Sequence, residues 1–411
     1  MKHFKNFKDY VNRDIKNNDT WSVPFIADGG PPNIYDRNST VMKMSKKELA
    51  KLKELDYKYG KVFNKRELDY QRNILNADEE KKKFFNARKK GKCYNPIFKH
   101  NPPTYKKDGT LDEAIKLRKE FKNFDNYLSQ FYIDRLNYLI GYMKIIETNK
   151  RSKEYADGIR NLFGRPSQHL VQKAERLIKE NPFVIRDESD KTIGSEEMKS
   201  RIEKELKKLG YDKWKVHITD TITPRMNVKD EYKVNINSEA KFSEIDFESL
   251  VAHELKGHVG RRFYGDKIGL DLFRFGLEGK NNTDEGLAIY NSLQIKNPKP
   301  NVLWNICLFI IAANQVDRLN FCELFDFIDQ YVDDDETCWK KTVRMKRNCE
   351  DTSMLFGDAE IDYLDGYLKV KDMSDAQRES LLKFQVGPQT LADIPKIKNF
   401  LEVNGFIDKD F

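Results

Sequence analysis

The stretch Val251-Ala-His-Glu-Leu-Lys-Gly-His258 constrains this chain more than any other part of its sequence. It places Glu254 between two histidines, and a second acid, Glu285, follows in Thr283-Asp-Glu-Gly-Leu-Ala288. Imidazole and carboxylate groups are usual ligands of a hydrolytic zinc ion, which keeps one position for water and has a base beside it. The pattern predicts a site for one zinc ion at His253, His258 and Glu285, with Glu254 as the catalytic base.

The spacing of the two histidines sets a condition on the backbone. They lie five residues apart, whereas the common zincin motif separates them by four. Five residues of ideal α-helix turn the second imidazole roughly 140° away from the first. A single π-type turn would absorb the additional residue, and Gly257 would let the backbone relax there. The alternative is two unrelated histidines on a surface helix, and the flanking sequence favours the metal site.

That flanking sequence predicts a small sheet followed by a helix from Glu244 to about Phe263. Ser243 and Asp246 have the spacing of a capping box. Apolar residues then recur on one helical face, at Ile245, Leu250, Val251, Leu255 and Val259. Upstream, residues 214–218 and 232–236 alternate as strands do. An edge strand beside the active-site helix would pair with an extended peptide substrate.

Glu285 has two interpretations. Thr283 is a predicted N-cap, so Glu285 would lie in the first turn of a helix, where a carboxylate also stabilises the helix dipole. Gly286 argues for a functional role, because a glycine in the first turn costs stability and permits close backbone approach. We therefore favour Glu285 as the third ligand.

The rest of the chain is predicted to be mostly helical. Helical patterns cover 45–92, two segments each within 111–148 and 154–180, and the last third, where Ser374 and Gln377 form a capping box. The predicted fold class is α+β: predominantly α-helical and zincin-like, with a small β-sheet beside the active-site helix. The predicted domains are a polar and basic extension (1–92) and a metallopeptidase domain (93–411), divided into a helical subregion (93–210), the sheet and zinc-site region (211–300) and a helical C-terminal region (301–411).

The positive charge is concentrated near the N-terminus. Residues 41–93 hold seventeen Lys/Arg against eight Asp/Glu, whereas the whole chain has a formal net charge of +8. Such a segment is either a solvated helical arm or a docking surface for an acidic partner. We find neither a nucleic-acid-binding motif nor a Gly-rich phosphate loop, so nucleic acid is not an expected partner.

The sequence also predicts a cytoplasmic location. Residues 1–20 are charged and lack the apolar core of a secretion signal. The apolar run 302–316 is too short to span a bilayer and is predicted to be a buried helix behind the site. Five cysteines without a C-x-x-C pair are expected to be free thiols in a reducing compartment, with Cys307 and Cys322 in the core.

Several separated motifs resemble one family. The chain is similar to the HExxxH metallopeptidases that include the microtubule-associated tyrosine carboxypeptidases and the bacterial proteins named for flavohemoglobin expression and a Gln-Glu-Gly-Leu-Pro motif. The resemblance spans roughly 95–411 and is carried, in order, by Asn95-Pro-Ile-Phe98, Phe163-Gly-Arg-Pro-Ser167, Ala240-Lys-Phe-Ser243, His253–Val259, Thr283–Ala288, Tyr363-Leu-Asp-Gly366 and Val403-Asn-Gly-Phe406. Asp284 departs from the family, where Gln, Thr or Glu is commoner.

The resemblance implies roles for these residues. It matches His253, His258 and Glu285 to the zinc ligands and Glu254 to the general base. It implies removal of a C-terminal residue, tyrosine in the characterised members, from a peptide or protein such as the acidic tail of tubulin. A carboxypeptidase must bind the terminal carboxylate, and Arg225, Arg261 and Arg262 are candidates by position. Tyr363 is a candidate to hydrogen-bond the tetrahedral intermediate.

Other interpretations of these residues remain open. The two adjacent arginines could form a solvated basic face, and the tyrosine could be a core residue. The alternative functions are a zinc endopeptidase or aminopeptidase on another substrate, and a metal-stabilised binding protein without catalysis. A purely structural site has no need of a base and favours four protein ligands, so Glu254 argues for an enzyme.

Overall fold

A computed structural model describes residues 43–65, 73–103, 105–184, 188–220, 225–229, 232–332 and 334–411. In the first half of the chain its elements are α2 (Lys46–Asn64), α4 (Ala77–Lys89), α5 (Thr110–Lys122), α6 (Ser129–Ile146), α7 (Lys153–Phe163), α8 (Gln168–Glu180), the 3₁₀-helix η1 (Glu188–Asp190) and α9 (Ser195–Lys208). The central part holds β1 (Lys215–Thr219), β2 (Met226–Lys229), β3 (Lys233–Asn237), α10 (Glu244–Leu250), the π-helix η2 (Val251–Val259), α11 (Gly260–Ile268), α12 (Asp271–Phe275) and α13 (Lys280–Leu293). The last part holds α14 (Val302–Ala313), α15 (Phe321–Ile328), α16 (Asp335–Lys346), α17 (Ile361–Lys371), α18 (Asp375–Phe384), the 3₁₀-helix η3 (Pro388–Asp393) and α19 (Ile394–Val403).

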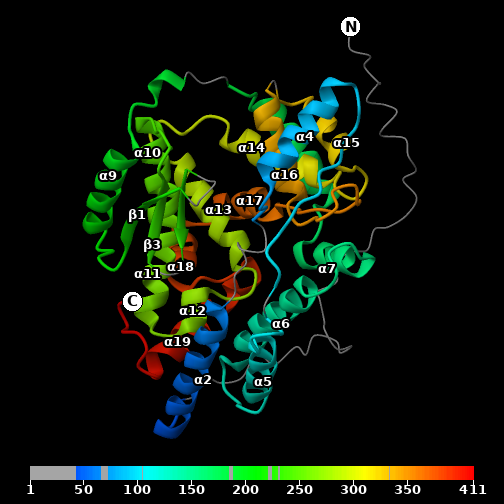
Figure 1. Ribbon diagram of the computed structural model, residues 1–411. Helices are drawn as coiled ribbons and strands as arrows, with labels where there is room; N and C mark the ends of the chain where they lie inside the picture. The colour runs from blue at the N-terminus through cyan, green and yellow to red at the C-terminus, as the bar shows by residue number, and fades with distance from the viewer. Residues whose placement is uncertain are drawn as a thin grey trace.

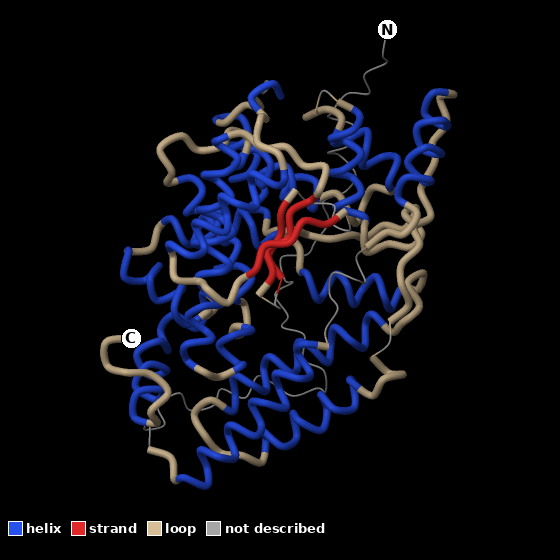
Figure 2. Tube along the Cα trace, turned by 60° about the vertical axis from the view of Figure 1, so that its left-hand side comes forward, coloured by secondary structure: helices blue, strands red, loops and turns tan. Residues whose placement is uncertain are grey.

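The three strands form one mixed sheet in the order β1-β3-β2. β1 pairs in parallel with β3, whereas β2 pairs antiparallel to it, with Val228 opposite Val234. Figure 1 shows α9 on the outer side of this sheet, and Figure 2 shows the strands as one small group among helices. The fold is therefore α+β and predominantly helical, as predicted.

Buried apolar side chains form three clusters, which are joined by the helices that carry the motif residues. The first lies among α2, α5, α6 and α12, the second among α4, α8, α14 and α16, and the third between the sheet, α9 and η2. On α13, Leu287 belongs to the first cluster and Ile289 to the second. On η2, Val251 and Leu255 belong to the third. The two helices that carry the motif residues are thus fixed from three sides.

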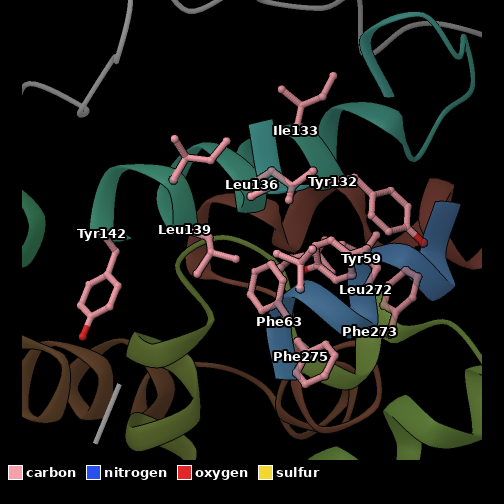
Figure 3. Close-up of a cluster of buried hydrophobic side chains, with 14 of the residues drawn as sticks. Tyr59, Phe63, Tyr132, Ile133, Leu136, Leu139, Tyr142, Leu272, Phe273 and Phe275 are labelled. Atoms are coloured by element: carbon pink, nitrogen blue, oxygen red, sulfur yellow. The ribbon is translucent and has the colours of Figure 1, made fainter. Parts of the chain in front are cut away.

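A buried carboxylate ties the N-terminal helix to the first cluster. Asp56 of α2 accepts hydrogen bonds from the backbone N–H groups of Asp271 (2.8 Å) and Leu272 (3.1 Å), and from the Tyr132 hydroxyl (2.6 Å). Burial raises the pKa of Asp56 to about 6. Around it, Tyr59 and Phe63 pack against Tyr132 and Phe275, as Figure 3 shows. These bonds satisfy two N–H groups at the start of α12.

Part of the basic segment, helix α4, packs against the second hydrophobic cluster. Phe84 of α4 lies in the second cluster, and Lys81 and Arg88 form ion pairs with Glu336 and Asp326 of α16 and α15. Part of the positive charge is therefore neutralised within the chain. The domain boundary at residue 93 and an acidic partner for residues 41–93 stay predictions, and residues 1–42 lie outside the described ranges.

Several local predictions are confirmed. Residues 111–148 and 154–180 each hold two helices, the run from 302 forms the buried helix α14, and Ser374 caps α18 with Gln377. The five cysteines are free, with Cys307 and Cys322 buried. The helix from Glu244 was predicted to run to about Phe263 and to end near Gly265, but helical structure continues to Ile268 and ends at Gly269 (φ 75°). Strand β2 was not predicted. Within the described residues, we find no helix long and apolar enough to cross a bilayer.

Candidate active site

A π-helix places the two histidines on one face. α10 begins with the predicted capping box of Ser243 and Asp246, and the helical segment continues without a break through η2 into α11. A π-helix bonds residues five apart, so side chains at i and i+5 lie nearly above one another. The imidazole rings of His253 and His258 accordingly have their centroids 5.1 Å apart. The predicted π-type turn is confirmed, although it extends over nine residues rather than one turn.

Glu285 approaches the same point from α13. Its Oε2 atom lies 3.9 Å from the Nε2 atoms of both His253 and His258. The three side chains offer one ligand atom each, and these atoms all lie within 4.8 Å of one another. Their side chains are between 17% and 25% exposed, so solvent can reach the group. Two imidazole nitrogens and a carboxylate oxygen that converge in this way fit a zinc ion with an open position.

The local structure around Glu285 differs from the prediction. α13 begins at Lys280 after Gly279 (φ 71°), so Thr283 is not its N-cap and Glu285 lies in the second turn. The Thr283 hydroxyl is instead buried within hydrogen-bond distance of the Val386 carbonyl (2.6 Å). A helix-dipole role for Glu285 therefore loses its basis, because that effect fades beyond the first turn.

Two glycine contacts let the helices approach this closely. A Cβ atom on Gly286 would lie 2.3 Å from the carbonyl carbon of Gly366 on α17. A Cβ atom on Gly257 would lie 3.0 Å from the Cβ atom of Ala288. Both contacts favour glycine by close approach, since neither position has a positive φ. α13 is thus held between η2 and α17 with Glu285 turned toward the histidines.

Asp284 contacts the ring nitrogen of His258 that faces away from Glu285. Its Oδ1 atom lies 3.1 Å from His258 Nδ1, which leaves Nε2 directed toward Glu285. Arg261 (3.2 Å) and Lys280 (3.4 Å) also pair with Asp284. A carboxylate that accepts from the far nitrogen of a histidine fixes the tautomer and the ring orientation. The sequence showed Asp284 only as a departure from the family, so this role was missed.

Burial and the Asp284 carboxylate shift the pKa values of the residues in this site. Burial lowers the pKa of His253 to about 3 and raises the pKa of Glu285 to about 7. Burial also opposes the charge on His258, but Asp284 outweighs it and raises the pKa of His258 to about 10. Burial raises the pKa of Glu254 as well, which suits a general base.

The substrate-binding candidates lie in different places. Arg225 binds the Asp246 carboxylate through two nitrogens (2.7 and 2.9 Å) at the start of α10, roughly 10 Å along the helix from His253. The structure thus does not bring Arg225 to the ligand group. Arg262 is partly buried on α11, whereas Arg261 is only 1% exposed and reaches the site through Asp284.

Tyr363 lies on α17 near Glu285. It is half-buried, and burial followed by the charge of Glu285 raises the pKa of its hydroxyl. Arg344 of α16 lies over its ring, 5.1 Å from the centroid. No sequence motif pointed to Arg344, because it lies far from the histidines along the chain. The site therefore has a neutral hydroxyl and a fixed cation beside the ligand group.

The fold and site define a helical α+β protein with a His-Glu-x-x-x-His motif on a π-helix and a glutamate from a neighbouring helix. The sequence model of the family "Microtubule-associated tyrosine carboxypeptidase" matches residues 82–409. This chain belongs to the microtubule-associated tyrosine carboxypeptidase family.

Individual relatives align over shorter segments. Microtubule-associated tyrosine carboxypeptidase 1 of Rattus norvegicus is 35% identical over 99 residues, and its namesake in Homo sapiens is 34% identical over 99 residues. Each alignment covers 24% of this chain and 20% of the relative. The aligned segment is thus a minor part of either relative.

Proposed function

We propose that this chain is a zinc-dependent carboxypeptidase that removes a C-terminal tyrosine from a peptide or protein with an acidic tail, such as that of tubulin. The observation that carries the proposal is the convergence of His253 Nε2, His258 Nε2 and Glu285 Oε2 beside Glu254. The names of the family and of its relatives support the carboxypeptidase activity, the tyrosine and an association with microtubules. An action on microtubules would place the protein in the cytoplasm.

The donor set suits zinc, with two nitrogen ligands and one oxygen ligand. A bound zinc ion supplies Lewis acidity, which polarises the peptide carbonyl and acidifies water. Glu254 takes a proton from the attacking water and returns it to the leaving amine, a role that its raised pKa favours. Tyr363, whose hydroxyl stays protonated at neutral pH, donates a hydrogen bond to the developing oxyanion.

The carboxypeptidase assignment is tested by tyrosine release from a peptide that ends in Glu-Glu-Tyr. We expect the purified full chain to release tyrosine from this peptide and to leave its C-terminally amidated counterpart intact. An N-terminally acetylated version controls for aminopeptidase activity and should be cleaved like the parent. Cleavage of the amidated peptide would instead establish an endopeptidase if the acetylated peptide is also cleaved, or an aminopeptidase if it is not. No cleavage of any peptide would contradict the tyrosine-terminated substrate.

A further inference from the structure

A second charged cluster lies beside the proposed catalytic group, on α16 and at the start of α17. Glu360 binds Arg344 (2.8 Å) through one carboxylate oxygen and Arg347 (2.5 Å) through the other. Asp358 also pairs with Arg347 (3.0 Å). Glu360 has a left-handed backbone conformation (φ 44°), which costs free energy for a residue other than glycine. The ion pairs hold this conformation and connect the two helices.

Neighbouring residues hold the Arg344 side chain in place, but one of its hydrogen-bond donors has no partner among the described residues. Its guanidinium lies beside two aromatic rings that contact each other, 4.5 Å from the centroid of Phe309 and 5.1 Å from that of Tyr363. Glu360 occupies one of its terminal nitrogens. Its Nε atom is buried and has no hydrogen-bond partner among the residues that the structure describes. The Arg344 side chain as a whole is 33% exposed, so part of it is open to solvent.

A second cation reinforces this position. Lys341, one turn earlier on α16, is 8% exposed and donates a hydrogen bond to the Asn305 side chain. Its ammonium lies over the rings of Trp304 (5.3 Å) and Phe309 (5.0 Å). Within the described ranges we find no carboxylate that forms an ion pair with Lys341. A buried cation without a counter-charge is costly, so the cluster is electrostatically prepared for an added anion.

We propose that Arg344, with Lys341 behind it, forms an anion subsite that binds a carboxylate group of the substrate. The inference rests on the proposed function, since it places a peptide at the ligand group. The guanidinium has donors left for a charge-assisted hydrogen bond, and its contacts with Glu360, Phe309 and Tyr363 hold it in place in advance. Tyr363 contacts Arg344 and is close enough to Glu285 to feel its charge, so an anion at Arg344 would lie on the Tyr363 side of the ligand group. Arg225 differs from Arg344 in that Asp246 binds two of its nitrogens.

Two carboxylates of an acidic peptide could fill the subsite: the terminal α-carboxylate or a glutamate side chain. Their shared chemistry is a planar anion, and peptide variants separate them. Binding is measured by calorimetry on the Glu254→Gln background, so that the Kd does not depend on turnover. The ligands are a peptide ending in Glu-Glu-Tyr, its amidated form and a form ending in Gln-Gln-Tyr.

We expect Arg344→Gln to weaken binding of the Glu-Glu-Tyr peptide by about 10- to 100-fold, because it removes a hydrogen-bonded charge. Lys341→Met acts through space and should weaken binding by about 3- to 10-fold. Lys340→Gln is the matched control on the same helix, since Lys340 is 68% exposed and, among the described residues, forms an ion pair with Glu336 alone. It should leave the Kd unchanged. Thermal unfolding and metal content of each variant show whether its fold is intact.

The peptide variants then assign the anion. If the effect of Arg344→Gln disappears with the amidated peptide, the subsite binds the terminal carboxylate, and if it disappears with Gln-Gln-Tyr, it binds a side chain. An equal loss with all three peptides, or an unchanged Kd in folded Arg344→Gln and Lys341→Met, would overturn the proposal. Failure of the wild-type chain to release tyrosine is a separate result, which contradicts the proposed function and not the binding measurement.

Discussion

Glu254→Gln is expected to lower the rate of peptide hydrolysis by about 10²- to 10⁴-fold, the usual contribution of a general base. The amide has nearly the same shape as the carboxylate but cannot take a proton from water. Because Glu254 is not one of the three residues whose ligand atoms converge, the variant should keep the zinc content of the wild-type chain. The predicted result is therefore a folded, metal-loaded and inactive protein.

This prediction is measured by initial rates of tyrosine release and by metal analysis of the same samples. Glu248→Gln is the matched control, because Glu248 is exposed on the preceding helix α10. It should keep full activity. Turnover by Glu254→Gln close to that of the wild-type chain would show that another group transfers the proton.

Asp284→Ala is expected to weaken zinc binding by about 10- to 100-fold, the usual cost of removing the carboxylate that supports a ligating histidine. The same change leaves the buried Arg261 without its partner, so we also expect a loss of about 3–5 kcal/mol in the free energy of unfolding. Asp284→Asn keeps an oxygen that can accept from His258 Nδ1, and it should retain more of the zinc affinity than Asp284→Ala.

Competition with a chelator measures the zinc affinity, and denaturant titration measures stability separately. Asp112→Asn on the exposed face of α5 is the control for metal binding and should leave the zinc affinity unchanged. Equal zinc affinity in Asp284→Ala and the wild-type chain would show that the contact between Asp284 and His258 does not position the ligand.

The shared face of the two histidines could be predicted from the sequence because it depends only on residues that are close together along the chain. The spacing of His253 and His258 demands a π-helical turn if both imidazoles are to share a face, and the structure has one. Capping boxes at Ser243 and Ser374 are equally local, since each involves residues three positions apart. Short-range patterns of this kind can be found without knowledge of the tertiary structure.

The predictions that failed depend on partners distant in sequence. Threonine is a residue type that favours the N-cap position, but the Thr283 hydroxyl contacts the Val386 carbonyl, and the helix begins one turn earlier. The ion pair of Arg225 with Asp246, 21 residues away, was likewise not predicted, and a role of Arg225 in substrate binding stays a prediction. Arg344 could not be found from sequence, because only the packing of α16 against α17 brings it to Tyr363.

The metal content of the purified full chain tests the central claim most directly. Elemental analysis after dialysis against excess zinc and removal of free metal should give about one zinc per chain, the stoichiometry of a site with three protein ligands. Glu285→Ala and His258→Ala should reduce this content while the fold persists by circular dichroism. A wild-type chain without bound zinc, or unchanged zinc in both folded variants, would contradict the site at His253, His258 and Glu285.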